Sequence, residues 1–376
     1  MGKTRVGLDI GSTAVRAAEV TMGGSPAIVR AAQVPLPAGA VENGEVRQLE
    51  VVAAGLKELW GRSGIKTKQV LLGVGNQRVV VREIALPWLP EKELRASLGF
   101  QVQEFIPMSV DEAVLDYDPL GEMEQEGRRM LRILLVAAQR VMVAAAVGAV
   151  QAAKLEPIGI DLNPFAVVRA VGTGDEGLDL EPTGDEAVVD VGAHVTNICV
   201  HDRGVTRFVR ILPSGGRDVT LAIARGLGLE DDVAEHLKRG FTVEEGTESA
   251  PARPDEPRPL TGGTETEVRT DATSQDDVGR VALSRAGSFV DEVRSSLEFY
   301  TAQVPGAKIG RVLVTGGGST LKGFLGLLRE RIPVTVDRGR VFERVKSELN
   351  LAPGDMEDAE PVLATAVGLA LPGRGA

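Results

Sequence analysis

The chain opens with Val6-Gly7-Leu8-Asp9-Ile10-Gly11-Ser12-Thr13, an apolar strand that ends in Asp-x-Gly and a polar turn before a second apolar strand, Ala14–Val20. The same pattern returns far along the chain as Ala187-Val188-Val189-Asp190-Val191-Gly192-Ala193-His194-Val195-Thr196, followed by Asn197-Ile198-Cys199-Val200. Each segment predicts a β-hairpin whose turn carries a carboxylate, a glycine and hydroxyl or other polar groups. A single Asp-x-Gly is typical of many ordinary turns. Two copies, each at the start of a similar set of elements, indicate two related lobes.

A third segment is rich in glycine. The strand Arg311–Thr315 runs into Gly316-Gly317-Gly318-Ser319-Thr320 and then into a predicted helix, 321–328. Glycines before a helix N-terminus leave room for a flat ligand and direct backbone N–H groups at an anion. Alone, this segment reads as a plain glycine turn. Together with two turns that can approach phosphate and hold a hydrated Mg²⁺ through aspartate, it predicts a nucleotide site.

Composition narrows the class of protein. The 376 residues are 43% hydrophobic and 25% charged, which is typical of a globular protein with room for two cores. The net charge of −11, without a Lys/Arg block, argues against nucleic acid as a partner. The single cysteine, Cys199, indicates a reducing compartment. The most apolar stretch, 141–153, is too short to span a bilayer and no signal-peptide pattern is visible, so we expect a cytoplasmic protein.

Changes of pattern along the sequence predict the domain organisation. We expect a first lobe at 1–78, an inserted subdomain at 79–156, a return to the first lobe with a linker at 157–184, a second lobe at 185–359 and a crossover helix with a tail at 360–376. Residues 244–277 hold few large apolar side chains, so we expect them to be disordered, with a docking tail as the less favoured alternative.

Apolar periodicity predicts the helices. The main ones are expected at 49–62, 91–105, 141–154, 281–303 and 362–369. Two shorter helices, at 218–225 and 231–239, are expected to end at the C-cap glycines Gly226 and Gly240.

The two hairpins and the glycine loop, in this order, resemble the phosphate-1, phosphate-2 and adenosine loops of the actin-like ATPase superfamily. Within it the chain resembles the PilM family of type IV pilus assembly proteins, relatives of FtsA. That likeness rests on the segments 81–87, 104–107, 111–117 and 296–300. The resemblance implies an α/β, two-lobed actin-like (ribonuclease H-like) ATPase fold, an inserted FtsA-like subdomain in the first lobe, and binding of ATP and Mg²⁺.

The resemblance also implies roles for single residues. Asp9 and Asp190 would hold Mg²⁺ through water. Phosphate contacts would come from Gly11, Ser12, Thr13, Arg16, Gly192, Ala193 and Thr196, and nucleoside contacts from Glu235, Lys238, Gly316, Gly317, Gly318 and Ser319. The plainer alternatives are a surface arginine at 16 and a surface ion pair between 235 and 238. His194 is interpreted as a turn residue, because no other metal ligands surround it in the sequence.

One position departs from the superfamily pattern. Hydrolytic relatives place a Glu-Pro pair or a glutamine where the attacking water is oriented, and here Asn163-Pro164 stands there. An amide cannot act as a general base, although a glutamine-like role in positioning water stays open. We therefore expect nucleotide binding with little or no hydrolysis.

The resemblance further implies a partner, the N-terminal cytoplasmic peptide of a PilN-like single-span membrane protein. It would bind between the first lobe and the inserted subdomain and tie the protein to the inner face of the plasma membrane without direct insertion. Pilus motor or platform components would be further partners. The residues expected near this groove are Trp88, Leu89, Phe100, Phe105 and Ile106; the alternative is that they form the core of the subdomain itself.

Two other functions remain as alternatives. An FtsA-like cell-division filament would carry a C-terminal amphipathic membrane helix, and residues 371–376 do not have that pattern. A small-molecule kinase of the same superfamily would need a substrate-activating carboxylate in the cleft and would not carry the 79–156 insert.

Overall fold

A computed structural model describes residues 3–173, 184–241 and 275–373. Most of the linker expected to end at 184, and all but the last three residues of the segment expected to be disordered, lie outside these described residues. Residues 275–277 begin a helix instead.

The first lobe is built on a six-stranded sheet with the order β10-β6-β1-β2-β3-β16. Strands β1 to β3 are antiparallel, whereas β6 and β10 run parallel to β1. Two helices, α1 (Leu49–Ser63) and α3 (Arg140–Ala152), bury their apolar stripes in one core with this sheet. The strands are β1 (Lys3–Ile10), β2 (Ala14–Met22), β3 (Ala27–Pro35), β6 (Gln69–Val74), β10 (Glu156–Leu162) and β16 (Lys346–Ser347), with a small hairpin of β4 (Val41–Glu42) and β5 (Glu45–Val46) beside them.

The second lobe repeats this architecture. Its sheet has the order β13-β12-β11-β14-β15, which corresponds strand by strand to β3-β2-β1-β6-β10. The two sheets also share their pattern of antiparallel and parallel pairs, so the two related lobes predicted from the hairpins are confirmed. The strands are β11 (Asp185–Val191), β12 (Thr196–Asp202), β13 (Val205–Leu212), β14 (Ile309–Thr315) and β15 (Thr335–Arg338).

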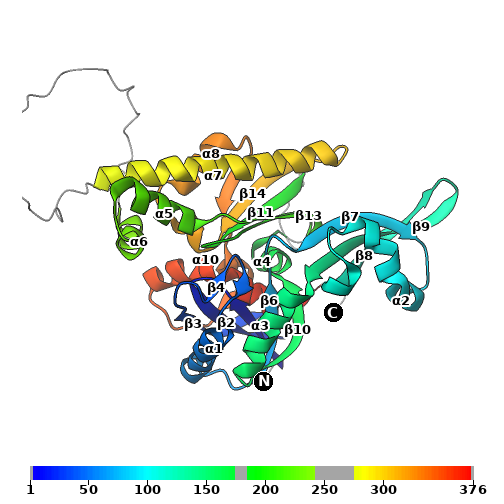
Figure 1. Cartoon of the computed structure of the whole chain (residues 1–376), viewed down its shortest axis with the longest axis horizontal. Helices are drawn as coiled ribbons and strands as arrows, with labels where there is room; N and C mark the ends of the chain where they lie inside the picture. The colour runs from blue at the N-terminus through cyan, green and yellow to red at the C-terminus, as the bar shows by residue number, and fades with distance from the viewer. Residues whose placement is uncertain (1–2, 174–183, 242–274, 374–376) are drawn as a thin grey trace, which may run out of the picture.

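Helices cover the outer face of the second sheet. Helix α7 (Gln275–Gln303) and α8 (Phe324–Arg331) form one core with it. Helices α5 (Gly216–Leu227) and α6 (Asp231–Gly240) pack against the N-terminal part of α7 in a smaller core. Figure 1 shows α7 running along the top of this lobe.

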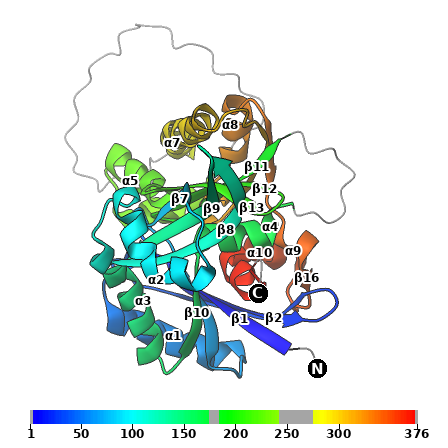
Figure 2. The same cartoon turned by 90° about the vertical axis from the view of Figure 1, so that its right-hand side faces the viewer.

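Two helices lie between the sheets. Helix α4 (Asn163–Val171) and α10 (Pro353–Ala370) share a core with residues of both sheets, and the short α9 (Val341–Arg344) packs beside them. Figures 1 and 2 show this layer between the upper and lower sheets.

Two glycines permit α10 to lie close to β1 and α4. A Cβ at Gly7 would lie 1.9 Å from the carbonyl oxygen of Ala366, and one at Gly368 would lie 1.8 Å from that of Ala166.

The inserted subdomain has its own small sheet and core. Strands β7 (Val80–Pro87), β9 (Arg128–Gln139) and β8 (Ala113–Gln125) pair in the order β7-β9-β8, and α2 (Glu91–Val102) packs on them, followed by short 3₁₀ turns at 103–105 and 110–112. The subdomain projects from the first lobe (Figure 1, cyan). Helix α3, which the expected division grouped with it, packs instead in the core of the first lobe.

Several helix ends differ from those predicted. Helix α10 begins at Pro353, not near 362, because Pro361 lies inside the helix and does not start it. Helix α7 begins at Gln275, with two aspartates in its first turn. Gly226 lies within α5, whose left-handed C-cap is Gly228, and the C-cap of α6 is Phe241. Within the described ranges no helix is long and apolar enough to cross a membrane.

Candidate functional site

A cavity of about 890 Å³ lies between the two lobes. It is lined by both hairpin turns, by the loop after β14, by the end of β6, and by parts of α4, α5 and α6. These turns all follow the carboxyl ends of central strands, which is where open α/β sheets place their ligands.

The two hairpins have the same turn geometry. The amide of Gly11 donates to Ala14 O at 3.0 Å, and the amide of Gly192 donates to Val195 O at 2.9 Å. The two residues within each turn, 12 and 13 or 193 and 194, line the cavity. Superposing the turns in sequence makes Thr13 equivalent to His194. The same alignment makes Arg16, which lies opposite Asp9, equivalent to Asn197, which lies opposite Asp190.

In the first hairpin, Arg16 lies opposite Asp9 in the β1–β2 register. Its Nη1 is 3.3 Å from Asp9 Oδ2, and both side chains are largely buried. Arg16 Nε is also buried and has no hydrogen-bond partner in the described part of the chain. Burial raises the pKa of Asp9, and the neighbouring guanidinium partly opposes that rise. Arg16 is therefore a cleft residue, and the alternative of a surface arginine is wrong.

In the second hairpin, Asn197 takes the place that Arg16 has in the first. It lies opposite Asp190 in the β11–β12 register, and its Nδ2 donates to Asp190 Oδ2 at 2.9 Å. Burial raises the pKa of Asp190 to about 6, although the hydrogen bond from Asn197 acts to lower it. The negative charge of Asp9 raises the pKa further. Asn197 also lines the cavity, with its Oδ1 buried and unpaired in the described structure.

Asn197 is not among the predicted site residues, although its equivalence to Arg16 could have identified it. No group of three or more His, Cys, Asp or Glu side chains that could hold a metal ion occurs in the described ranges. Asp9 and Asp190, one from each lobe, lie close enough to interact electrostatically across this cleft.

Thr196 does not line the cavity. It is fully buried, and its hydroxyl donates to Ser214 O at 2.8 Å. The reason is its position: by the equivalence of the turns it corresponds to Val15, a core residue of β2, and not to Thr13. His194 takes the place of Thr13, and burial together with the charge of Arg217 lowers the pKa of its imidazole.

The glycine loop closes on the second hairpin. Gly316 has a φ of 85°, and a Cβ there would lie 2.5 Å from Asp190 Oδ1. A Cβ at Gly318 would lie 2.5 Å from Val191 Cγ1, so side chains at either position would clash with the hairpin. Ser319 is buried, donates to Gly316 O at 2.7 Å and does not line the cavity, whereas Thr320 does.

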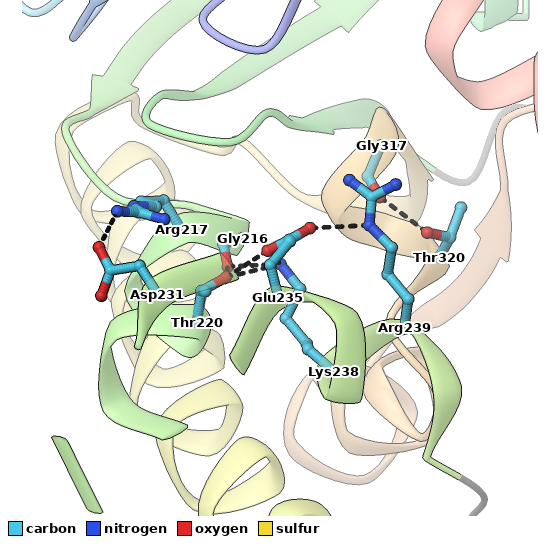
Figure 3. Close-up of polar contacts among 9 residues, drawn as sticks. All are labelled: Gly216, Arg217, Thr220, Asp231, Glu235, Lys238, Arg239, Gly317 and Thr320. Atoms are coloured by element: carbon cyan, nitrogen blue, oxygen red, sulfur yellow. Dashed lines mark hydrogen bonds and ion pairs between the residues drawn. The ribbon is translucent and has the colours of Figure 1, made fainter. Parts of the chain in front are cut away.

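Helix α6 presents a charged cluster to the same cavity (Figure 3). Lys238 Nζ lies 2.6 Å from Glu235 Oε2, and Arg239 Nε lies 2.8 Å from Glu235 Oε1. The Lys238 side chain is only 13% exposed, which is low for a surface pair. Burial favours the neutral carboxyl, but hydrogen bonds from Lys238 and Thr220 outweigh it and lower the pKa of Glu235.

An apolar wall completes the cavity beside this cluster. It comes from α5, α7 and the start of α8, and the rings of Phe289 and Phe324 stack with their centroids 5.8 Å apart. This wall was not predicted, because its residues are far apart in the chain and resemble ordinary core positions. Its lining side chains are Val219, Ala286, Phe289, Leu321 and Phe324.

Asn163 is the first residue of α4 and lines the cavity. Its Oδ1 is buried and has no hydrogen-bond partner in the described structure. The side chain occupies the space above two glycines at the end of β6: a Cβ at Gly73 would lie 2.2 Å from this Oδ1, and one at Gly75 would lie 3.3 Å from Asn163 Cβ. Asp161, two residues earlier, is instead paired with Arg169.

The five residues expected near a partner groove have different surroundings. Ile106 is buried in the core of the inserted subdomain, and Leu89 and Phe105 pack against that core. Phe100 is 86% exposed on α2. Trp88 donates from Nε1 to Glu122 and lies under the guanidinium of Arg129. For Ile106 the alternative of a subdomain core residue is therefore correct.

A different apolar surface lies where the first lobe meets the subdomain. Strand β10 is the edge of its sheet, and it exposes Ile158 (53%) and Ile160 (45%). Asp118 of β8 lies close enough to Asp161 to interact with it electrostatically. Burial, with the charges of neighbouring aspartates, raises the pKa of Asp118, and the nearby charge of Arg169 partly opposes that rise.

Comparison with known proteins gives a consistent relationship. The structure is similar to that of the PilM-PilN type IV pilus biogenesis complex, with a TM-score of 0.76, 28% identity and 97% of each chain covered. MreB5 of Spiroplasma citri bound to ADP shares the fold alone, with a TM-score of 0.53, 12% identity, and 97% of this chain and 94% of that one covered.

Sequence matches agree with the structural ones. Residues 187–368 match the cell division protein FtsA family. FtsA of Neisseria meningitidis serogroup B is 34% identical over 84 residues, a stretch that spans 22% of this chain and only 19% of the relative. Residues 7–251 match the family described as type IV pilus assembly protein PilM. The chain, with its two actin-like lobes and inserted subdomain, belongs to the PilM family of type IV pilus assembly proteins.

Proposed function

We propose that this protein is an actin-like scaffold of type IV pilus assembly that binds Mg-ATP in the cleft between its lobes and a PilN-like membrane protein beside its inserted subdomain. The observation that carries the nucleotide part is the pair of equivalent hairpins. They bring Asp9 and Asp190 together across a cavity that a glycine loop and an apolar wall complete.

The residues present fit a magnesium-bound nucleotide. Two buried amide oxygens, Asn163 Oδ1 and Asn197 Oδ1, lack partners in the described structure and line the cavity, which suits the water shell of a hydrated cation. The glycines at 316 and 318 leave the backbone open where a Cβ would clash. Bound Mg²⁺ would supply charge neutralisation for the phosphates, and Asp9 and Asp190 would hold it through water.

Calorimetric titration with ATP tests this site. Replacing Asp9 or Asp190 by alanine is expected to weaken Mg-ATP binding at least about tenfold, or about 1.4 kcal/mol. The control is Asp355→Ala, at an exposed position on α10, which should bind as the wild type does. Equal affinity for Mg-ATP in the wild type and all three variants would show that the nucleotide does not bind in this cleft.

The partner part of the proposal rests on the edge of β10. A free strand edge can pair with an extended peptide, whose side chains then contact the exposed Ile158 and Ile160. The carboxylate of Asp118, close to Asp161 of this edge strand, favours a peptide that carries positive charge. A neighbour of similar structure is a complex of PilM with PilN. We therefore assign the N-terminal cytoplasmic peptide of a PilN-like protein to this edge.

Binding of a synthetic peptide tests the assignment. Ile160→Asp should reduce affinity for the N-terminal peptide of the PilN-like protein at least about tenfold, because it places a carboxylate against apolar side chains. Leu351→Asp changes a similarly exposed apolar residue elsewhere and should have no effect. If Phe100→Asp abolishes binding while Ile160→Asp does not, the peptide binds on α2 instead.

Slow turnover completes the proposal. The water-orienting position carries Asn163, whose amide cannot take a proton as a carboxylate does. A scaffold that holds ATP without rapid hydrolysis would keep its lobes in one state for long periods, and nucleotide state would then shift the population of partner-binding conformations. The chain's membership of the PilM family supports the role of a pilus assembly scaffold over that of an FtsA-like filament or a small-molecule kinase.

A further inference from the structure

Thr220 is a buried residue of α5 at the centre of the charged cluster (Figure 3). Its Oγ1 lies 2.5 Å from Glu235 Oε2 and 2.9 Å from Lys238 Nζ. A hydroxyl has one proton to donate, and an ammonium group can only donate. Two acceptors lie within reach of its proton: Glu235 Oε2 and, at 3.2 Å, the Gly216 carbonyl oxygen. The carboxylate is nearer and charged, so Thr220 donates to Glu235 and accepts from Lys238.

Lys238 has no donor left for a ligand. Its Nζ carries three N–H groups, and it has three acceptors at hydrogen-bonding distance: Gly216 O at 3.0 Å, Thr220 Oγ1 at 2.9 Å and Glu235 Oε2 at 2.6 Å. The lysine, which the resemblance assigns to the nucleoside, is thus fully used in holding α5 and α6 together around Glu235.

Glu235 is the group that remains available. Its Oε2 takes the hydrogen bonds of Thr220 and Lys238. Among the described residues, its Oε1 has only Arg239 as a partner, and the Arg239 side chain is 73% exposed. The residue lines the cavity. An ionised carboxylate can only accept hydrogen bonds, so the ligand groups that suit this oxygen are hydroxyls or N–H groups.

We propose that Thr220 is a positioning residue which, with Lys238, fixes the Glu235 carboxylate toward the cleft and makes the site selective for ribose hydroxyls. This inference rests on the proposed nucleotide-binding function. The 2′ and 3′ hydroxyls of a ribonucleotide donate hydrogen bonds to Oε1 of the fixed Glu235 carboxylate. A dideoxynucleotide lacks both hydroxyls and leaves that charged acceptor without a ligand partner. A carboxylate free to rotate loses this discrimination, since it must first be ordered by the ligand.

The ratio of affinities for ATP and 2′,3′-dideoxyATP, measured by calorimetry with Mg²⁺ present, tests the inference. The wild type should prefer ATP at least about tenfold. Thr220→Val keeps the shape of the side chain but lacks the hydroxyl, and it should lower that ratio severalfold through weaker ATP binding, with little change for the dideoxy compound. Thr220→Ser keeps the hydroxyl and should retain the wild-type ratio. Glu235→Gln, which removes the ionised acceptor, should bring the ratio close to one.

Each contrary result has a distinct meaning. Failure of the wild type to bind either nucleotide overturns the proposed function and this inference with it. Equal binding of ATP and dideoxyATP by the wild type overturns the inference alone, as does an unchanged ratio in Thr220→Val. If the valine variant does not fold, as judged by its thermal unfolding, Thr220→Ala removes the same hydroxyl without adding atoms, and its ratio decides the question.

Discussion

Arg16 lies opposite Asp9 at the base of the cleft, with its Nη1 3.3 Å from the carboxylate, and it is the only residue of the β1–β2 pair that forms an ion pair with this aspartate in the described structure. Asp9 also faces Asp190 from the other lobe. Two buried carboxylates repel each other, and Arg16 supplies the positive charge that offsets this repulsion when no cation is bound.

Removing this charge should destabilise the nucleotide-free protein. Arg16→Met is expected to lower the free energy of unfolding by about 2 kcal/mol near pH 8, above the Asp190 pKa of about 6, as measured by urea denaturation. Arg16 lowers the Asp9 pKa relative to the variant, so this contribution is lost as the pH falls and the carboxylates take up protons. Arg62→Met, which breaks an exposed pair with Glu58, should cost less than about 1 kcal/mol. If Arg16→Met lowers the free energy of unfolding as much at acidic pH as near pH 8, the electrostatic explanation is wrong.

Asp190 should make stability fall with rising pH when Mg²⁺ and nucleotide are absent. Its pKa is raised from 3.8 to about 6, so the folded protein binds more protons than the unfolded chain across that interval. The stability due to the protonated form is complete below pH 3.8 and is lost as the pH rises through about 6. A shift of two units corresponds to about 3 kcal/mol.

The substitution Asp190→Asn removes this titration and keeps the size of the side chain. We expect it to stabilise the metal-free protein at neutral pH and to flatten the dependence of the unfolding free energy on pH between about 4 and 7. Asp202→Asn, at an aspartate whose pKa is lowered by neighbouring arginines, should not give this flattening. An unchanged slope in Asp190→Asn would show that Asp190 ionises normally in the cleft.

The fold was predictable because its decisive features are local and repeated. The hairpins around Asp9 and Asp190 are encoded by contiguous apolar runs with a glycine turn, and each lobe repeats the same order of strands. Thr196 was misplaced because an Asp-x-Gly motif with a hydroxyl a few residues later suggests a phosphate contact, whereas the turn length decides which residue faces the cleft. Only the paired hydrogen bonds of Gly11 and Gly192 establish that His194, and not Thr196, corresponds to Thr13.

Other parts of the site depend on contacts that sequence spacing does not encode. Asn197 acts through its register with Asp190, and Thr220 acts through the packing of α5 against α6. The position of Ile106 was also undetermined, because an apolar residue beside a helix end suits a groove and a core equally well. Tertiary packing decides whether each of these side chains faces the cleft, a groove or a core, and the local sequence does not.

A buried carboxylate at the junction of the lobes should be important for stability. Glu186 at the start of β11 accepts the backbone N–H of Thr173, which follows α4, at 2.7 Å, and its Oε1 lies 3.1 Å from Nε2 of the fully buried His201. Glu186→Ala leaves both groups without this partner and is expected to cost about 3 kcal/mol in chemical denaturation. Glu186→Gln keeps an oxygen acceptor and should cost clearly less.

The effect of pH separates this contact from simple packing. Burial opposes ionisation of Glu186, but its contact with His201 and the hydrogen bond from the Thr173 amide prevail, and its pKa is lowered. The ionised form therefore stabilises the fold above the unfolded pKa of 4.5, and this contribution is lost as the pH falls through the lower folded value. Identical losses for the alanine and glutamine variants would show that the carboxylate oxygen contributes nothing specific.

We expect the rate of ATP turnover to depend on Asn163. The wild-type protein should bind ATP and hydrolyse it well below about 1 s⁻¹, the lower end of typical enzyme rates. Asn163→Asp fits the same space above Gly73 and Gly75 and places a carboxylate at the N-terminus of α4, where the helix dipole favours negative charge. A positioned base is worth about a hundredfold in rate, so phosphate release under single-turnover conditions should rise toward that factor. Asn163→Leu has a similar size and no acceptor, and it should show no gain. Rapid hydrolysis by the wild type that Asp9→Ala abolishes would instead make this cleft a true ATPase site, with the Asn163 amide sufficient to orient the attacking water.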